Sequence, residues 1–345
     1  MMIKEAISRA VAGQSLAEKE AEQVMDEIMT GQASPAQIAA LLTAMRFKGE
    51  TIEEITGFAR SMRRHATPVR SRHPLLVDTC GTGGDGANTF NISTIAAFVL
   101  AGAGVPVAKH GNRSVSSRCG SADVLEALGV NLELSPADLE ECLDRVGIAF
   151  LFAPVLHKAM KYAAGPRREI GIRTVFNVLG PLTNPAGAKA QIIGVYSAEL
   201  VPVIARVLAR LGTRRAFVVH GAGGLDEISP AGPAVVAEVR EEEIREYSLD
   251  PADYGFSYVP VEALAGGSPE HNAALAREIL RGAPGPCRDT VLLNAALGLV
   301  AAGKAGDLAG GLALAAASID SGAAAGKLDE LVAFTRRAGR QVVSL

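Results

Sequence analysis

Asp78-Thr-Cys-Gly-Thr-Gly-Gly-Asp-Gly-Ala-Asn-Thr-Phe-Asn-Ile-Ser-Thr94 is the stretch that decides the fold. It follows the apolar run 75–77 and leads into the apolar run 95–100, which is the order strand, glycine loop, helix. Its glycines permit backbone conformations closed to other residues and leave their N–H groups bare. Bare amides at a helix N-terminus form an anion site, because unpaired donors and the helix dipole both favour negative charge. With the side-chain oxygens of Asn91, Ser93 and Thr94 at the start of the helix, the stretch predicts a phosphate-binding loop.

The glycine loop does not identify its ligand by itself. No Gly-Lys-Ser/Thr follows at the spacing of a P-loop, and the glycines do not fit the Gly-x-Gly-x-x-Gly dinucleotide pattern. A mobile turn between strand and helix explains one such loop equally well. The function therefore depends on what the rest of the chain brings to the same place.

Charge and cysteine spacing exclude several classes of protein. The 345 residues carry a formal charge of only −3, with no basic tail or acidic block, so we expect no binding to nucleic acid or to a membrane surface. The four cysteines form no C-x-x-C pair, which favours reduced thiols in the cytoplasm over zinc or disulfides, and Cys80 is expected to be a buried thiol. The longest apolar runs are too short to span a bilayer, and the N-terminus lacks the apolar core of a signal peptide. We expect a soluble, cytoplasmic protein.

Residues 1–66 are predicted to form a small all-helical domain of four amphipathic helices. Ser15 with Glu18, and Thr51 with Glu54, have the spacing of capping boxes. Ser34-Pro35 pairs an N-cap serine with proline at the first helical position. A unit of this size is expected to pack on another part of the chain or on a second subunit.

After a linker at 67–74, helices and strands alternate, which predicts an α/β domain with a mostly parallel sheet. The predicted strands are 75–77, 105–108, 148–152, 191–196 and 216–220, and the predicted helices between them are 92–103, 121–128, one from Ser135-Pro136, and 198–211. Residues 164–187 interrupt this alternation and are interpreted as an excursion that rejoins the N-terminal helices. The α/β domain then comprises 75–163 and 188–345, with an alanine-rich helical tail from Ser268 covering the sheet.

Three polar loops follow predicted strands, and ligands of such sheets bind at the carboxyl ends of the strands. The second loop, Lys109-His-Gly-Asn-Arg-Ser-Val-Ser-Ser117, offers a cation and hydroxyl groups to phosphate oxygens, while His110 and Asn112 suit a polar substrate. Ser121 is expected to cap the next helix. The third loop carries Asp226-Glu227, a pair of hard oxygen ligands suited to magnesium beside a phosphate.

In this order and spacing the loops resemble the anthranilate phosphoribosyltransferase family of tryptophan biosynthesis. The matching segments are Gly81-Thr-Gly-Gly-Asp85, Asn91-Ile-Ser-Thr94, Lys109–Ser117, Gly120-Ser-Ala-Asp123, Gly171-Ile-Arg-Thr174, Asn177-Val-Leu-Gly-Pro-Leu-Thr-Asn-Pro185 and His220-Gly-Ala-Gly-Gly-Leu-Asp-Glu227. The likeness covers essentially the whole chain. It implies a helical domain, an α/β domain of the nucleoside phosphorylase and phosphoribosyltransferase type, and a homodimer joined through the helical domain.

The resemblance also implies a reaction and a set of site residues. Phosphoribose would pass from phosphoribosyl pyrophosphate (PRPP) to the amine of anthranilate, with release of pyrophosphate and with two Mg²⁺ ions per subunit. The residues implied to bind PRPP are Gly81, Gly84, Asp85, Thr89, Asn91, Ile92, Ser93, Thr94, Lys109, His110, Gly111, Asn112, Arg113, Ser114, Val115, Ser116, Ser117 and Ser121. Those implied to bind anthranilate are Gly81, Asn112, His157 and Arg167, and those implied to hold the metal are Ser93, Asp226 and Glu227. His110 and Arg167 are the candidate catalytic residues, with His110 a candidate general base.

Two alternatives are distinguishable from this sequence. Pyrimidine nucleoside phosphorylases have a similar fold and first loop, but they carry Lys-His-Ser where this chain has Asp78-Thr-Cys80. Some relatives are thought to bind nucleic acid, which the near-neutral charge disfavours.

Overall fold

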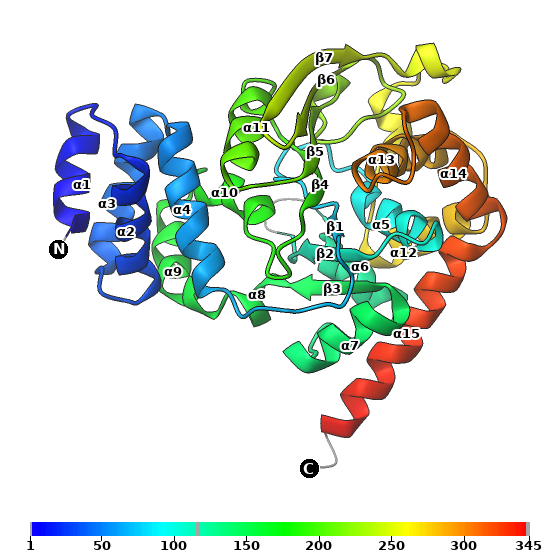
Figure 1. Ribbon diagram of the computed structural model, residues 1–345, viewed down its shortest axis with the longest axis horizontal. Coiled ribbons are helices and arrows are strands. Elements are labelled where there is room, and N and C mark those ends of the chain that lie inside the picture. Colours follow the sequence, from blue (N-terminus) through cyan, green and yellow to red (C-terminus); the bar gives the residue numbers. More distant parts are fainter. Residues whose placement is uncertain (1, 115–117, 343–345) are drawn as a thin grey trace.

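The computed structural model describes residues 2–114 and 118–342, with side chains to residue 339. The N-terminal domain consists of α1 (Met2–Val11), α2 (Glu18–Met29), α3 (Pro35–Lys48) and α4 (Ile52–His65), which lie together at one end of the molecule (Figure 1). Its apolar stripes, including Ile28, Leu41 and Phe58, are fully buried in a common core.

In the N-terminal domain, two of the three predicted helix N-caps are confirmed. Ser34 and Thr51 accept hydrogen bonds from the N–H groups of Gln37 and Glu54, as the sequence predicts. The prediction for Ser15 with Glu18 is wrong, because α2 begins at Glu18 and the Glu20 carboxylate accepts from the N–H of Ala17. The same carboxylate also accepts from Arg9 of α1, so Glu20 both caps the start of α2 and joins it to α1.

Among the described residues, seven strands form one sheet in the order β3-β2-β1-β4-β5-β6-β7. The strands are β1 (Val77–Asp78), β2 (Val107–Gly111), β3 (Ile148–Phe152), β4 (Ala190–Gly194), β5 (Arg215–His220), β6 (Ala234–Arg240) and β7 (Glu243–Leu249). The first five in spatial order pair in parallel, and β6 and β7 add an antiparallel edge. The mostly parallel sheet is thus confirmed, and the β6–β7 hairpin is an addition that the sequence analysis did not predict.

Helices cover both faces of this sheet (Figure 1). The remaining helices are α5 (Ile92–Gly102), α6 (Ser121–Leu128), α7 (Pro136–Val146), α8 (Ala153–Leu156), α9 (Lys161–Ile170), α10 (Phe176–Leu179), α11 (Leu200–Arg210), α12 (Pro269–Leu280), α13 (Pro286–Ala301), α14 (Leu308–Asp320) and α15 (Ala323–Val342). Neighbouring strand residues point to opposite faces. Ile192 and Phe217 therefore join the core under α5 and α13, while Ile193 and Val218 join a core shared with the N-terminal helices.

Two strand and cap predictions need correction. Strand β2 extends to Gly111, so Lys109, His110 and Gly111 are strand residues and not loop residues. Pairing with β3 accounts for the longer strand, because Lys109 lies opposite Phe150 and Gly111 lies opposite Phe152. The N-cap of α6 is Gly120, and Ser121 is the first helical residue.

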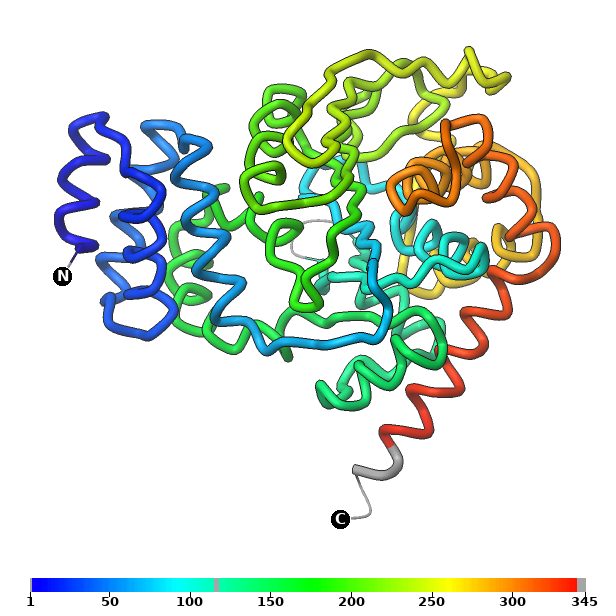
Figure 2. Tube along the Cα trace, viewed as in Figure 1, coloured from blue at the N-terminus to red at the C-terminus, as the bar shows by residue number. Residues whose placement is uncertain are grey.

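After leaving the N-terminal helices the chain returns to them with α9 and α10, and later α11 also packs on α4, a path that can be followed in Figure 2. The linker after α4 is held by hydrogen bonds from the N–H groups of Thr67 and Val69 to the carbonyls of Leu156 and Pro185. Helix α9 then packs against α2 and α3, and α10 contacts α4. Residues 161–182 thus belong to the same core as the first four helices.

No single helix within the described residues is long and apolar enough to cross a membrane. One bent pair, Leu308–Asp320 with Ala323–Gly339, passes that test by length and composition only.

Candidate active site

The glycine loop (residues 78–91) is fastened to the end of β4 and to the acid loop (residues 220–228). The N–H of Thr82 donates to the carbonyl of Gly194 at 2.8 Å, and the N–H of Gly83 donates to Asp226 Oδ2 at 2.8 Å. A Cβ atom on Gly81 would lie 2.9 Å from that carboxylate oxygen, and one on Gly194 would overlap the carbonyl of Asp226. Only glycine permits this close approach, so the two loops meet as the sequence predicts for loops at one edge of a sheet.

A buried cation lies between the glycine loop and the acid loop. Lys109, in the middle of β2, donates from Nζ to the carbonyl and hydroxyl oxygens of Thr79 and to Ser93 Oγ at 3.3 Å. The backbone of Ser93 lies beside the Glu227 carboxylate and helps to stabilise its ionised form. In this structure the Lys109 ammonium holds the glycine loop through Thr79 and partly offsets the charge of Glu227, and its contact with phosphate oxygens stays a prediction.

The carboxylates of Asp85, Asp226 and Glu227 lie near one another, and Lys109 interacts with Glu227. Loss of hydration, then the charge of Asp85, raises the pKa of Asp226 above its ordinary value. Loss of hydration, then the charge of Asp226, raises the pKa of Glu227 well above its ordinary value. Neighbouring carboxylates repel one another unless a cation offsets their charge. Their hard oxygen atoms are the ligands that Mg²⁺ prefers. The predicted metal residues Asp226 and Glu227 offer donors of this type, Asp85 lies close enough to interact with both electrostatically, and the Ser93 backbone lies beside Glu227.

Two histidines form the other side of the site. His110 donates from Nδ1 to the carbonyl of Gly180 at 3.1 Å, which leaves Nε2 as an acceptor. The His157 ring lies with its centroid 5.0 Å from that of His110, and the backbone of Thr183 lies beside it. Both Nε2 atoms are buried and have no hydrogen-bond partner in the structure.

Both histidines are neutral at physiological pH. Burial, then the proximity of His157, lowers the pKa of His110 to about 3, and burial lowers the pKa of His157 to about 4. Two adjacent lone pairs in a buried place suit a ligand that brings its own N–H or O–H donors.

Asp78 connects β1, β2 and the excursion. Its Oδ1 accepts from the backbone N–H of His110 at 3.0 Å, and its Oδ2 accepts from Asn184 Nδ2 at 2.8 Å. The amide of Asn184 also donates to the carbonyl of Ala108 at 2.7 Å. Burial raises the pKa of Asp78 to about 6 although Lys109 and these donors oppose the shift.

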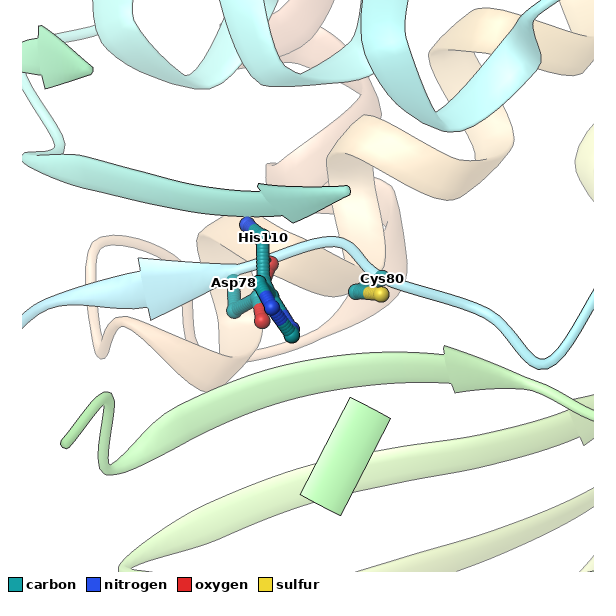
Figure 3. Close-up of side chains that lie close together, drawn as sticks. All are labelled: Asp78, Cys80 and His110. Atoms are coloured by element: carbon teal, nitrogen blue, oxygen red, sulfur yellow. Dashed lines mark hydrogen bonds between the residues drawn. The ribbon is translucent and has the colours of Figure 1, made fainter. Parts of the chain in front are cut away.

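Asp78, Cys80 and His110 lie close together (Figure 3), with one potential metal-ligand atom each within 4.8 Å of the others. Both Asp78 oxygens already accept hydrogen bonds, so they are poorly placed to bind a cation. Burial and the nearby acids raise the pKa of the Cys80 thiol, which keeps it protonated and unreactive. The prediction that Cys80 is buried is not confirmed, because its side chain at the start of the glycine loop is only partly buried.

Two arginines of the excursion lie over aromatic rings, and one of them, Arg173, contacts the glycine loop. Arg167 on α9 lies with its guanidinium 4.9 Å from the ring centre of Phe176, and burial lowers its pKa. It has no ion pair with a carboxylate of residues 2–114 or 118–339, so it is suited to the carboxylate of a ligand. Arg173 lies 4.4 Å from the ring centre of Tyr196 and donates to the carbonyl of Gly84 in the glycine loop.

The described residues on either side of positions 115–117 are held by contacts with the start of α6. Ser114 and Gly120 donate their N–H groups to Asp123 Oδ2, and Ser121 Oγ donates to the carbonyl of Asn112. The Arg113 guanidinium pairs with Asp123 and Glu126, so in this structure it is directed to α6.

The remaining predicted site residues lie around the start of α5 and the end of β2. Gly111 packs so closely on Ser121 and Phe150 that a Cβ would clash with both. Thr89 pairs with Ala265, Ile92 is buried in the core, and Thr94 Oγ1 is buried with no partner in the structure. Asn91 is the N-cap of α5, but its side chain makes no cap bond and binds Cys119 and Asn272 instead. Val115, Ser116 and Ser117 lie outside the described residues.

Fold and site together define a glycosyltransferase with a helical bundle and an α/β domain. Residues 4–66 match the helical bundle domain of a glycosyl transferase family, and residues 73–325 match its a/b domain. The chain is 69% identical over 334 residues, 97% of each chain, to the anthranilate phosphoribosyltransferase of Pelotomaculum thermopropionicum, and 62% identical over its full length to that of Desulforamulus reducens. The chain therefore belongs to the anthranilate phosphoribosyltransferase family.

Solved structures agree with this assignment. The anthranilate phosphoribosyltransferase of Thermus thermophilus superposes with a TM-score of 0.91 at 49% identity, covering 96% of this chain and 99% of its own. The Saccharomyces cerevisiae enzyme in complex with PRPP and Mg superposes with a TM-score of 0.88 at 29% identity, covering 97% and 98%. The same yeast enzyme has been solved in complex with 4-fluoroanthranilate.

Proposed function

We propose that the chain transfers the phosphoribosyl group of PRPP to the amine of anthranilate in tryptophan biosynthesis, forming N-(5-phosphoribosyl)anthranilate and pyrophosphate. One observation supports this most directly. The glycine loop at the N-terminus of α5 lies directly against the acid loop, with the Gly83 N–H bonded to Asp226. Amide groups that suit phosphate and carboxylates that suit a cation are therefore directly adjacent, which is what binding of a Mg²⁺-bound pyrophosphate requires.

The donor side of the site uses the glycine loop, Ser93 and the acid loop. The backbone of Ser93 lies beside the Glu227 carboxylate, and the Asp226 carboxylate accepts from the N–H of Gly83 in the glycine loop. We propose two Mg²⁺ ions per subunit, one toward Ser93 and Glu227 and one toward Asp226 and Asp85. When bound, Mg²⁺ offsets the negative charge that grows on the departing pyrophosphate.

The acceptor side uses Arg167 and the histidine pair. The guanidinium of Arg167 would pair with the anthranilate carboxylate, and the Nε2 lone pairs of His110 and His157 would accept hydrogen bonds from the amine. A pKa near 3 makes His110 a weak base, so its role would be to orient the amine rather than to remove its proton early. We also assign to this side Asn112 of the second loop and Gly81 of the glycine loop.

The chemistry needs positioning more than a strong nucleophile. An aromatic amine attacks weakly, so release of pyrophosphate from the ribose carbon dominates the barrier. Holding amine and ribose carbon together removes an entropy cost worth roughly 7–11 kcal/mol in favourable cases. Preorganised amides and the acid loop then stabilise the charge of the leaving group without reorganising.

We also propose a homodimer that is joined through the helical domain and located in the cytoplasm. Phe47 and Val11 are the most exposed large apolar side chains within the described residues, at 95% and 74%, and both lie in that domain. The division into residues 1–66 with the excursion 164–187, and an α/β domain of 75–163 and 188–345, is part of this proposal. It is supported by the packing of α9 on α2 and α3.

Product analysis tests the reaction. The purified protein is incubated with PRPP, anthranilate and Mg²⁺, and the phosphoribosylated product and pyrophosphate are quantified. We expect one pyrophosphate for each anthranilate consumed. Phosphate-dependent cleavage of thymidine, with no consumption of anthranilate, would overturn the proposal in favour of a nucleoside phosphorylase.

A further inference from the structure

The side-chain amide of Asn91, at the start of α5, is held from two sides. Its Oδ1 accepts from Asn272 Nδ2 at 2.9 Å and from the thiol of Cys119 at 3.4 Å. Its Nδ2 donates to the carbonyl of Cys119 at 3.1 Å. An amide nitrogen carries two hydrogens, so one N–H of Asn91 remains for a ligand once these bonds are made.

Asn272, on α12, is itself locked in one orientation. It is 2% exposed, and its Oδ1 accepts from the backbone N–H of Gly267 at 2.7 Å. Because that N–H is only a donor, the oxygen of Asn272 must face it, which leaves the nitrogen to face Asn91. The orientation of Asn91 is thereby set by a residue far away in the sequence.

The segment that carries this bond also supports the glycine loop through its backbone. The N–H of Phe90 donates to the carbonyl of Leu264 at 3.2 Å, and the N–H of Gly266 donates to the carbonyl of Asn88 at 2.8 Å. Thr89 pairs with Ala265 as an isolated bridge. A Cβ on Gly266 would lie 2.6 Å from the carbonyl oxygen of Thr89, so the two segments are in tight contact.

We propose that Asn272 is a positioning residue for the PRPP half of the site. This inference rests on the proposed function, in which Asn91 binds the phosphoribosyl donor. Because Asn272 holds the Asn91 oxygen toward itself, an Asn91 N–H stays available to donate to the hydroxyl or phosphate oxygens of the phosphoribosyl donor. Asn272 touches no reacting atom and acts only through Asn91.

Two substitutions probe this orientation differently. In Asn272→Asp a carboxylate faces Asn91 Oδ1, so two acceptors oppose each other and the Asn91 amide must turn. A turned amide would place its oxygen toward the Cys119 carbonyl and withdraw the N–H from the ligand. In Asn272→Ser the donor is too short to reach Asn91, which leaves the Asn91 amide unrestrained on that side.

The test measures both substrates in each variant. We expect KM for PRPP to rise about tenfold, the equivalent of roughly 1.4 kcal/mol of lost binding, while KM for anthranilate stays within about twofold. PRPP with Mg²⁺ should also raise Tm less in the variants than in the wild type. Thr335→Val is the matched control, because Thr335 is likewise buried on a C-terminal helix and accepts from a backbone N–H, that of Asn131, outside the site. It should leave both KM values unchanged.

A double-mutant cycle with Asn91→Ala separates positioning from general destabilisation. If Asn272 acts through Asn91, Asn272→Ser should change KM for PRPP no further in the Asn91→Ala background. Equal changes in both backgrounds, or an unchanged PRPP KM and Tm shift in folded Asn272 variants, would overturn the inference. Failure of the proposed function would appear separately, as absence of transfer by the wild type, and the PRPP-dependent Tm shift would still test Asn272.

Discussion

At the scale of single residues, the site combines groups in unusual states of protonation. His110 and His157 are held neutral by burial, whereas Asp78, Asp226 and Glu227 resist ionisation. Clusters of buried titratable groups with opposite shifts are typical of functional sites. Here the Nε2 atoms of the neutral histidines are free to accept hydrogen bonds from a ligand, Asp226 and Glu227 offer oxygen ligands to a cation, and Asp78 is engaged by His110 and Asn184.

The histidine pair should make the protein sensitive to acid. A folded-state pKa below the ordinary 6.5 contributes stability that is present above pH 6.5 and is lost as the pH falls toward 4. For His157 the loss between pH 7 and pH 5 should be about 2 kcal/mol, which the variant His157→Gln should not show. Urea unfolding of both proteins at several pH values measures this difference, and the acids with raised pKa values affect both alike. Parallel pH profiles for the two proteins would contradict the prediction.

At the scale of elements, helix α4 is fixed by more than its own cap. Glu54 is fully buried and accepts from the N–H groups of Leu16 and Thr51, while its carboxylate pairs with Lys48 at 2.8 Å. One carboxylate thus joins the start of α4, the end of α3 and the loop before α2.

Replacing Glu54 should therefore cost far more than replacing the cap residue. Glu54→Ala removes the counter-charge of the buried Lys48 ammonium and leaves the N–H groups of Leu16 and Thr51 without their acceptor, and we expect a loss of about 3–5 kcal/mol in the free energy of unfolding. Thr51→Ala removes one cap bond and should cost about 1 kcal/mol. Thermal and urea unfolding compare the two variants. Equal losses would show that Glu54 is only a capping residue.

Sequence analysis predicted the elements better than the contacts between them. The glycine loop, the caps at Ser34 and Thr51, and the parallel strands follow from local patterns, which the structure confirms. The β6–β7 hairpin was not predicted.

Contacts between distant side chains were also not predicted, because they exist only once the chain is folded. Arg113 pairs with acids on α6, and Lys109 binds Thr79, although both residue types suit phosphate equally well by chemistry alone. The asparagines Asn184 and Asn272 carry no motif that marks them. A third, Asn294, binds both backbone groups of Ile228, next to the acid loop's carboxylates, and is equally unmarked.

At the scale of the whole molecule, the two cores meet at the sheet. Strands β4 and β5 send alternate side chains into each core, so the helical domain and the α/β domain share a boundary next to the excursion. The same excursion carries Arg167, which we propose to bind the acceptor, so the packing of the helical domain would help to position that side chain.

The exposed apolar side chains of the helical domain predict self-association there. Phe47→Glu should shift the protein from twice the chain mass to the chain mass in sedimentation equilibrium, with an unchanged circular dichroism spectrum. Leu314→Glu is the control, because Leu314 is exposed on α14 of the other domain and should leave the assembly intact. A wild-type protein that sediments as a monomer, or a Phe47→Glu variant that remains a dimer, would contradict this.

The loss of anthranilate fluorescence after addition of PRPP, with and without Mg²⁺, tests the account most directly. The chain contains no tryptophan, so the protein background is low. We predict a Mg²⁺-dependent decay in the wild type that slows by about a hundredfold or more in Asp226→Asn, which loses one carboxylate of the acid loop. In Arg167→Ala the decay should recover at high anthranilate concentration. No decay by folded wild-type protein with ample Mg²⁺, or an Asp226→Asn variant as fast as the wild type, would contradict the account.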